Sequence, residues 1–408
     1  MQQRSKQRGI TLVVIAVAML ALLAMAGLAI DIGRLVGDKA RLQAAVDAAA
    51  LAAAKVVDTT GSTVTATAAA NNVFAINVAA QPDLAAALGT ITVNYSNTVG
   101  PFVAGSAPPL YAQVIATGFS VAATFSSVLG FNTFALNASA TAGASPTLSN
   151  ACNQTPMMVC GAPASGAAPV YGFAVGQITA LQLSAGTSPV TLAPPGYFLQ
   201  QSSGVNSQDQ DFAGGYAACN TVGTGEPAQT GTLPAPVAQG LDTRFNEYTT
   251  GDVNSGSYPP DAIITQPTGG NRLMCTTPAC TTIQTVAGAV ITNSSQYGAF
   301  SYEGMYQPRL AAANYDIPPA PNGNGMVDRR VLAVPVGDCT GAAPGGNSVP
   351  VLGLACMFML QDVDPVAGQV FAEVVQSCEV NGTPGPGPNN GPGPYSIQLY
   401  HVFGSPQS

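Results

Sequence analysis

Oxygen-bearing side chains at alternate positions are the feature of this sequence that most directly suggests chemistry. The D-x-D pairs at 209–211 and 362–364 could converge on one hard cation, because two carboxylates in a loop can share an ion. The segments 252–256 (DVNSG) and 322–328 (NGNGMVD) alternate oxygen ligands as calcium loops do. Neither completes an EF-hand, and Asx-turns explain both at least as well. We therefore predict no metal and no cofactor, and a weak calcium loop stays open as the alternative.

Side chains for nucleophilic or acid–base catalysis are scarce. His401 is the single histidine, so it has no imidazole partner for a metal, and no G-x-S-x-G elbow accompanies it. We interpret His401 as a partly exposed strand residue. The sequence predicts that this protein is not an enzyme.

Eight cysteines, all beyond residue 150, form an even set without the paired C-x-x-C motifs of a zinc site. We interpret them as disulfides formed in an oxidising compartment. Spacing does not fix their connectivity, although the short separations Cys152–Cys160 and Cys275–Cys280 favour local bridges. The predicted disulfide cysteines are Cys152, Cys160, Cys219, Cys275, Cys280, Cys339, Cys356 and Cys378.

An uncharged apolar run over residues 10–30 precedes all of these side chains. If it spans a membrane, it determines on which side of the membrane they lie. As a helix rising about 1.5 Å per residue, the run would be about 31 Å long, which matches the hydrocarbon thickness of a bilayer. The tail, residues 1–9, carries Arg4, Lys6 and Arg8 without an acid, so the positive-inside rule places it in the cytoplasm. We expect a single-pass protein with its N-terminus inside and the bulk of the chain outside.

A cleaved secretory signal is the alternative interpretation of the same run. The run is longer than the usual apolar core of about 7–15 residues in a signal peptide. Helical pattern also continues through the nearest small-residue site, residues 24–26 (AMA). We therefore favour a retained anchor.

Charge is divided unequally between the two ends of the chain. Residues 58–408 carry 17 acidic and 5 basic side chains and no lysine, whereas residues 1–57 carry 3 acidic and 7 basic ones. Binding to nucleic-acid phosphates requires clustered Lys or Arg. We therefore expect no nucleic-acid partner.

Residues 31–57 continue the apolar run as an amphipathic stem helix, because their apolar side chains recur with the helical period. The other face carries Asp31, Arg34, Asp38 and Arg41, an alternating-sign series that we expect to be exposed. No proline interrupts the first 57 residues, so we expect one helix of 48 residues, roughly 72 Å, over 10–57.

The outer half of this helix needs a partner for its apolar stripe, either the following domain or like helices of neighbouring subunits. Ala29, Gly33 and Gly37 repeat every four residues, which allows close helix contact at the bilayer exit or, alternatively, a flexible joint. The predicted helix-packing residues are Gly33, Leu35, Gly37, Leu42, Val46, Ala49 and Ala53.

Two segments, 27–34 (GLAIDIGR) and 39–54 (KARLQAAVDAAALAAA), closely resemble the N-terminal region of TadE/TadG-like proteins of the Tad (Flp) pilus-assembly machinery. The resemblance implies a bitopic protein of the bacterial inner (cytoplasmic) membrane with a periplasmic or extracellular bulk. Its implied partners are other pilus-assembly membrane proteins or copies of itself. Type IV-like pilins are cut after a glycine before the apolar run. Gly9 is suitably placed for such a cut, but Val14 stands where the mature pilin has a glutamate.

The remainder of the chain divides by composition into two segments. Residues 58–145 predict a small α+β domain, pilin-like by analogy, with a helix and three strands at 64–78, 91–95, 111–117 and 133–140. Residues 146–408 hold all the cysteines and most of the prolines, and predict a β-rich domain. Its expected strands include 177–183, 331–336, 356–360, 369–375 and 397–403.

The predicted fold class is therefore α+β: a single N-terminal transmembrane helix extended into a long amphipathic stem, a small pilin-like α+β domain, and a β-rich disulfide-stapled domain. We expect a structural or minor-pseudopilin-like component of the Tad/Flp machinery that acts by helix packing and periplasmic protein–protein contacts. The alternative is a membrane-tethered extracytoplasmic binding module or adhesin, whose β-rich domain recognises an outside ligand.

Overall fold

The computed structural model describes most of the chain. The described residues are 8–87, 89–162, 171–183, 196–199, 208–214, 216–227, 234–249, 252–277, 280, 282–340, 348–366, 368–380, 382–384 and 393–401. The chain forms two compact units. Unit 1 comprises Met1–Ala144 and Ile397–Ser408, and unit 2 comprises Ser145–Ser396.

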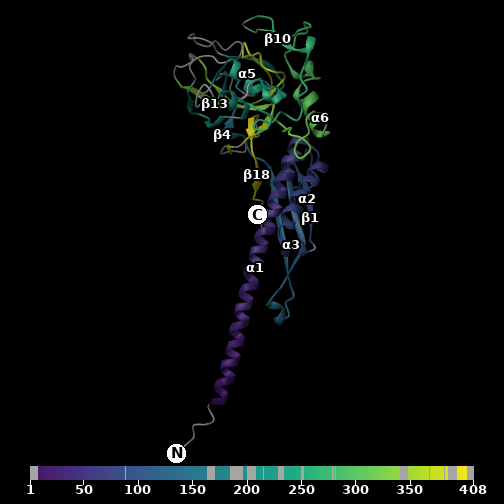
Figure 1. The fold of residues 1–408 in the computed structure, drawn as a ribbon, viewed down its shortest axis with the longest axis vertical. Coiled ribbons are helices and arrows are strands. Elements are labelled where there is room, and N and C mark those ends of the chain that lie inside the picture. Colours follow the sequence, from purple (N-terminus) through teal and green to yellow (C-terminus); the bar gives the residue numbers. More distant parts are fainter. Residues whose placement is uncertain are drawn as a thin grey trace, which may run out of the picture. The chain divides into compact units, whose positions relative to one another are not determined.

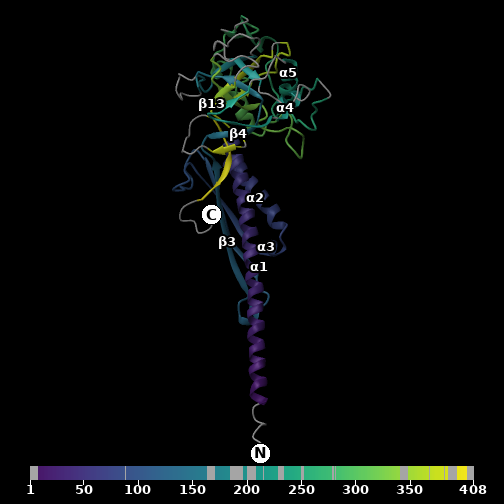
Figure 2. The ribbon, with the colours of Figure 1, turned by 90° about the vertical axis from the view of Figure 1, so that its left-hand side faces the viewer.

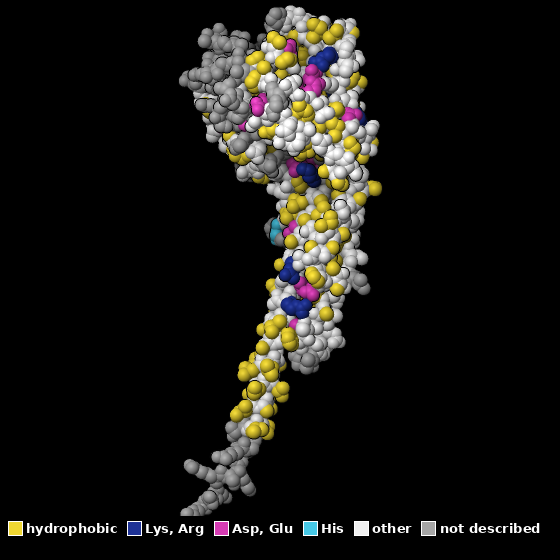
Figure 3. All heavy atoms as spheres, viewed as in Figure 1, with side chains coloured by type: hydrophobic (Ala, Val, Ile, Leu, Met, Phe, Trp, Pro, Cys, Tyr) yellow, Lys and Arg dark blue, Asp and Glu magenta, His cyan; other side chains and the backbone are white. Residues whose placement is uncertain are grey.

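The N-terminal segment forms one uninterrupted helix, α1 (Arg8–Thr60), as the apolar periodicity and the lack of proline predict. Within the described residues it is the helix long and apolar enough to cross a membrane, with a mean hydropathy of 2.8 over its most apolar window. Large apolar side chains from Leu12 to Leu23 are exposed. Figure 3 shows apolar side chains covering the N-terminal half of α1.

Unit 1 packs the second half of α1 against two further helices and a four-stranded antiparallel sheet (Figures 1 and 2). The sequence predicted one of these helices and three of these strands near their observed bounds. The helices are α2 (Thr63–Ala79) and α3 (Pro82–Ala86), and the strands in spatial order are β1 (Thr90–Ser96), β2 (Tyr111–Ala122), β3 (Thr133–Ala144) and β18 (Ile397–Tyr400).

Buried and more exposed side chains alternate along the strand β2 of this sheet. Ala112, Val114 and Ala116 of β2 are buried and belong to the same core cluster as the apolar stripe of α1. Gly118, at φ +77°, lies where the register between β2 and β3 shifts, and its left-handed backbone favours glycine. A short 3₁₀ helix, η1 (Ser126–Leu129), follows β2 at the tip of the β2–β3 hairpin.

The strand β18 differs from the sequence expectation. We expected residues 397–403 to form a strand of the β-rich domain, whereas Ile397–Tyr400 pairs antiparallel with β3 in unit 1. The tyrosines Tyr111 and Tyr400 contact edge to face, with ring centroids 5.4 Å apart. Because Ala144 and Ile397 are direct partners in the ladder, the chain leaves unit 1 and returns to it on adjacent strands.

Unit 2 is built on six strands that close into a ring through the pairings β12–β5, β5–β7, β7–β6, β6–β14, β14–β13 and β13–β12. A closed ring leaves no unpaired edge strand. Its strands are β5 (Met157–Cys160), β6 (Ile178–Leu183), β7 (Gly196–Leu199), β12 (Val331–Gly337), β13 (Val349–Met359) and β14 (Val370–Val375). One core cluster takes alternate residues of three of them, namely Leu332, Val334, Val336, Ala355, Met357, Met359, Val370, Ala372 and Val374.

Shorter elements surround this ring. The helices are α4 (Gln208–Gly214), α5 (Pro234–Asp242) and α6 (Gln307–Ala311), with single turns η4 (Thr243–Phe245), η5 (Gly269–Asn271), η6 (Ser294–Tyr297) and η7 (Tyr302–Tyr306). The strands are β4 (Leu148–Gln154), β8 (Tyr216–Thr221), β9 (Gly225–Glu226), β10 (Leu273–Cys275), β11 (Ile283–Thr285), β15 (Ser377–Glu379), β16 (Gly382–Pro384) and β17 (Gly393–Tyr395).

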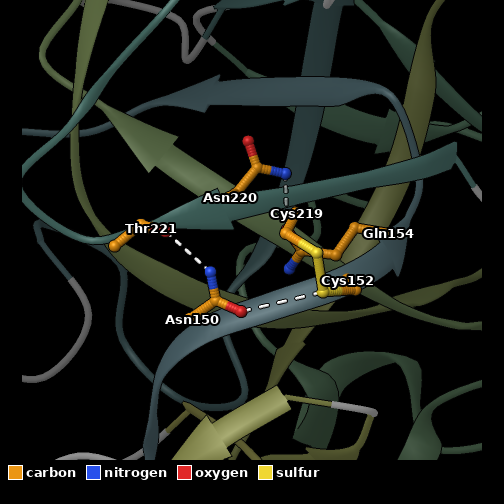
Figure 4. Close-up of a disulfide and its surroundings, with 6 residues drawn as sticks. All are labelled: Asn150, Cys152, Gln154, Cys219, Asn220 and Thr221. Carbon is orange, nitrogen blue, oxygen red and sulfur yellow. Dashed lines mark hydrogen bonds between the residues drawn. A yellow bond between two sulfur atoms is a disulfide. The ribbon is translucent and has the colours of Figure 1, made fainter.

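All eight cysteines lie in four pairs at disulfide distance: Cys152–Cys219, Cys160–Cys339, Cys275–Cys280 and Cys356–Cys378. The local bridge expected between Cys152 and Cys160 is wrong, whereas the local bridge Cys275–Cys280 is present. Cys152 lies in β4 directly opposite Cys219 of β8 (Figure 4), while Cys160 ends β5 in the ring. Cys152 and Cys160, although close in the sequence, therefore belong to different sheets.

Candidate functional site

The predicted stripe on α1 faces the core of unit 1. Leu42, Val46, Ala49 and Ala53 are fully buried, and Leu35 is half-buried against the same cluster. The sequence left two covers open for this stripe, the following domain or a neighbouring subunit. The cover in the structure is the chain's own β2, β3 and α2. These side chains therefore cannot dock another chain while unit 1 is folded.

The other two predicted packing residues lie on the uncovered side of α1. Gly33 is exposed and Gly37 half-exposed, and a Cβ atom added at either position would meet nothing within 4 Å. Their neighbour Val36 is 64% exposed. This smooth apolar surface lies directly beyond the membrane-length run, and we call Gly33, Val36 and Gly37 the exit face.

Asp31, the first charged residue after that run, holds the β2–β3 hairpin to α1. Its carboxylate accepts backbone N–H groups from Thr124 at 3.2 Å, Phe125 at 2.9 Å and Ser126 at 2.6 Å. The sequence predicted an exposed Asp31, but the residue is only 4% exposed. Its partners lie more than 90 residues away in the chain, so helical periodicity could not reveal them.

Arg34, one helical turn later, makes two further links. Its guanidinium donates to the Thr124 hydroxyl and, at 3.2 Å, to both carboxylate oxygens of Asp83 in α3. Both members of the ion pair are close to half exposed, so the pair itself stabilises little. Asp38 is also buried, against the expectation of exposure, and pairs at 3.1 Å with Arg41, which is exposed as expected.

Gly27 lets the hairpin approach the helix closely. A Cβ atom at Gly27 would lie 2.7 Å from the Cβ of Phe125, closer than two such carbons approach in proteins. Glycine is therefore required by contact, in a helix where it otherwise costs about 1 kcal/mol. We call Gly27, Asp31 and Arg34, with the loop residues 124–126, the exit clamp.

The clamp also sets the ionisation of its carboxyl group. Desolvation raises the pKa of Asp31, but hydrogen bonds from Ser126, Phe125 and Thr124 outweigh it and hold the pKa below the usual value of 3.8. Asp31 is therefore a carboxylate at neutral pH. Both of its oxygens already accept hydrogen bonds from within the protein.

Two of the oxygen-rich motifs have side chains that are engaged by contacts within the protein. Asn254 accepts the N–H groups of Gly256 and Ser257 at 3.0 Å, which is an Asx-turn. Asp362 pairs with Arg272 at 2.5 Å. Among the residues that the structure describes, no group of three or more His, Cys, Asp or Glu side chains could hold a metal ion. His401 follows β18 and is exposed.

Unit 2 contains an open cleft of about 780 Å³ beside the Cys275–Cys280 bridge. The Arg272–Asp362 ion pair and the side chain of Met274, which is 39% exposed, line it. The cleft combines apolar surface with charged groups, as ligand sites do. Sequence reasoning missed it, because residues 272–274 and 362 are joined only by the fold.

Comparison with known proteins gives one match. Residues 9–58 match the model of a family described as putative Flp pilus-assembly TadE/G-like. The matched segment lies within α1 and contains Gly27, Asp31 and Arg34 of the exit clamp. No curated protein and no solved structure matches the chain.

Proposed function

We propose, from the match of residues 9–58 to the Flp pilus-assembly TadE/G-like family, that this chain is a structural component of a Tad-type pilus-assembly machine. The match and the apolar helix together suggest a membrane-anchored Tad component. The proposal extends this to a single-pass protein of the bacterial inner membrane, with residues 1–9 in the cytoplasm and both units on the outer side. It has a structural role there, comparable to that of a minor pseudopilin.

The observation that carries the proposal is the division of α1 at the exit clamp. From Leu12 to Ile30 the large apolar side chains are exposed, a state that is stable only in lipid or against another protein. Beyond Asp31 the apolar stripe is buried by unit 1. One helix thus joins a membrane-length segment rigidly to a folded domain, as an anchor for assembly requires.

The exit face is the surface we assign to partner contact. Small residues let two helices approach closely, and Gly33 and Gly37 are the small residues of the predicted packing set that unit 1 leaves uncovered. The chain thereby packs against another pilus-assembly membrane protein or a copy of itself where α1 leaves the bilayer.

Substitution of the exit face tests this proposal. Gly33→Leu should abolish co-purification and cross-linking with other pilus-assembly proteins, because its side chain would hold a partner helix away. Unit 1 should stay folded, because Gly33 is exposed and a Cβ atom added there meets nothing within 4 Å. Ala68→Leu on α2, another exposed helical position, is the matched control. Unchanged complexes with Gly33→Leu would contradict the assignment.

The cleft of unit 2 favours a second candidate, a membrane-tethered binding module or adhesin. Under this alternative, Met274→Asp should remove attachment to a surface or ligand and leave the membrane complexes unchanged. The exit-face variant should then retain attachment. The two variants therefore separate assembly from recognition.

A further inference from the structure

The tip of the β2–β3 hairpin, residues 124–131, carries apolar side chains that unit 1 does not cover. Phe125 is 49% exposed and Phe131 is 60% exposed. Val128 and Leu129 lie between them in the sequence, and no charged residue occurs anywhere from 84 to 208. An exposed apolar loop without charge is unfavourable in water and favourable in lipid.

The tip lies at the level of the membrane-length run. Phe125 contacts Gly27, which belongs to the run at 10–30 and precedes Asp31 by four residues, about 6 Å along the helix. Figures 1 and 2 show the hairpin extending along α1 toward its N-terminal half. An anchor inserted to residue 30 therefore brings the hairpin tip to the membrane interface.

Five backbone N–H groups of the tip have acceptors within the protein, which lowers the cost of placing the tip in a low-dielectric setting. Asp31 accepts the N–H groups of Thr124, Phe125 and Ser126. The N–H groups of Gly130 and Phe131 bond within the tip, at 3.1 Å each, to the carbonyls of Ser127 and Ser126. Irregular backbone enters a membrane interface at low cost only when such groups are satisfied internally.

We infer that the hairpin tip is a second membrane contact, which inserts Phe125 and Phe131 into the outer leaflet of the bilayer that α1 spans. The inference rests on the proposed membrane anchor. The occupant is lipid, because the tip is continuous with the lipid-facing surface of the run. Two contacts, a spanning helix and a clamped wedge, would hold unit 1 at a fixed height and tilt on the membrane.

Tryptophan fluorescence tests the inference, because the chain contains no tryptophan of its own. The reporters are Phe131→Trp, with Phe125→Trp as a second tip variant, in the full chain reconstituted into phosphatidylethanolamine/phosphatidylglycerol vesicles. Val103→Trp is the matched control, an apolar residue of unit 1 that is 51% exposed in the β1–β2 loop, at the other end of the sheet. Leu20→Trp, in the middle of the run, reports on the anchor itself.

Lipids brominated on the acyl chain should quench the two tip reporters and Leu20→Trp severalfold, and leave Val103→Trp unchanged. Quenching of Leu20→Trp alone, with the tip reporters open to aqueous acrylamide, would overturn the inference but keep the anchor. Tip reporters shielded from both quenchers would mean that protein covers the tip, which also overturns it. Absence of quenching at Leu20 would instead contradict the proposed anchoring.

Discussion

At the scale of single residues, Asp31 is the side chain on which the exit clamp depends. Its carboxylate is the common acceptor for three consecutive backbone N–H groups of a loop that has no acid of its own. A buried N–H without an acceptor is costly, so the loop can lie against α1 only while this acceptor is present.

Asp31→Asn should loosen the clamp, because an amide offers one acceptor oxygen and turns a donor toward the loop. We expect a lower melting temperature for unit 1 and faster proteolysis at the hairpin tip. Since the folded pKa is below 3.8, the contribution of Asp31 is present above that pH and lost as the pH falls further, so wild type should approach the variant in acid. Asp47→Asn, which keeps an acceptor for Gln43, is the control and should melt as wild type does.

For Glu373 in unit 2 we expect stability to change with pH in the direction opposite to that expected for Asp31. Burial raises its pKa from 4.5 to about 7, although the Tyr302 N–H donates to it at 2.7 Å. Between these values only the folded protein holds the proton, so stability falls as the pH rises through this window and is level above it. Glu373→Gln removes this loss and should stabilise unit 2 relative to wild type at pH 8 more than at pH 5, by up to about 3 kcal/mol. A constant difference in melting temperature across this range would contradict it.

Sequence reasoning identified Asp31 and Arg34 only as members of a charged face and of a family-like segment. Their roles follow from contacts to Thr124 and Asp83, which lie far away in the sequence. The nearest signals in the sequence were Gly27, a helix-weakening residue in an apolar run, and the long uncharged stretch that contains the hairpin tip.

At the scale of elements, local periodicity predicted what it can encode. The helix α1, the helix α2 and the first three strands of unit 1 were expected near their observed bounds, because period and turn residues are local signals. The pairing of β18 with β3 and the pairing of Cys152 with Cys219 join distant segments, and neither was predicted. In unit 2, β6, β12, β14 and the second half of β13 were expected as strands, but their closure into a ring depends on distant pairings and was not predicted.

The buried half of α1 provides the prediction at this scale. Leu42→Ala should destabilise unit 1 by about 2–5 kcal/mol, because it removes a fully buried side chain and leaves a cavity. Val36→Ala, on the exit face of the same helix, should change stability by less than about 0.5 kcal/mol. Thermal unfolding in detergent measures both. Equal effects would show that the stripe is not covered by the chain's own sheet.

At the scale of the whole molecule, unit 2 is an insertion into a hairpin of unit 1. Ala144 and Ile397 are ladder partners, and Ser145 and Ser396 close the insertion, because the Ser145 N–H donates to the Ser396 carbonyl at 2.8 Å. Each unit has its own core, so the two should fold independently.

Removal of the insertion tests this independence. Joining Ala144 to Ile397 through Asn-Gly, the two-residue sequence that favours a tight hairpin turn, should leave unit 1 folded and membrane-bound. Thermal unfolding and membrane fractionation provide the readouts. If the shortened chain fails to fold while the full chain folds, unit 1 requires unit 2 and the insertion view is wrong.

The account as a whole depends on residues 10–30 remaining in the mature protein and in lipid. Intact-mass measurement of the native protein, after separation of membranes from soluble material, tests this directly. We expect a detergent-extracted chain that begins at Met1 or at Ile10 and retains the entire run. A water-soluble chain whose first residue lies beyond Ala26 would contradict the anchor, the exit clamp's position at the membrane and the assembly role together.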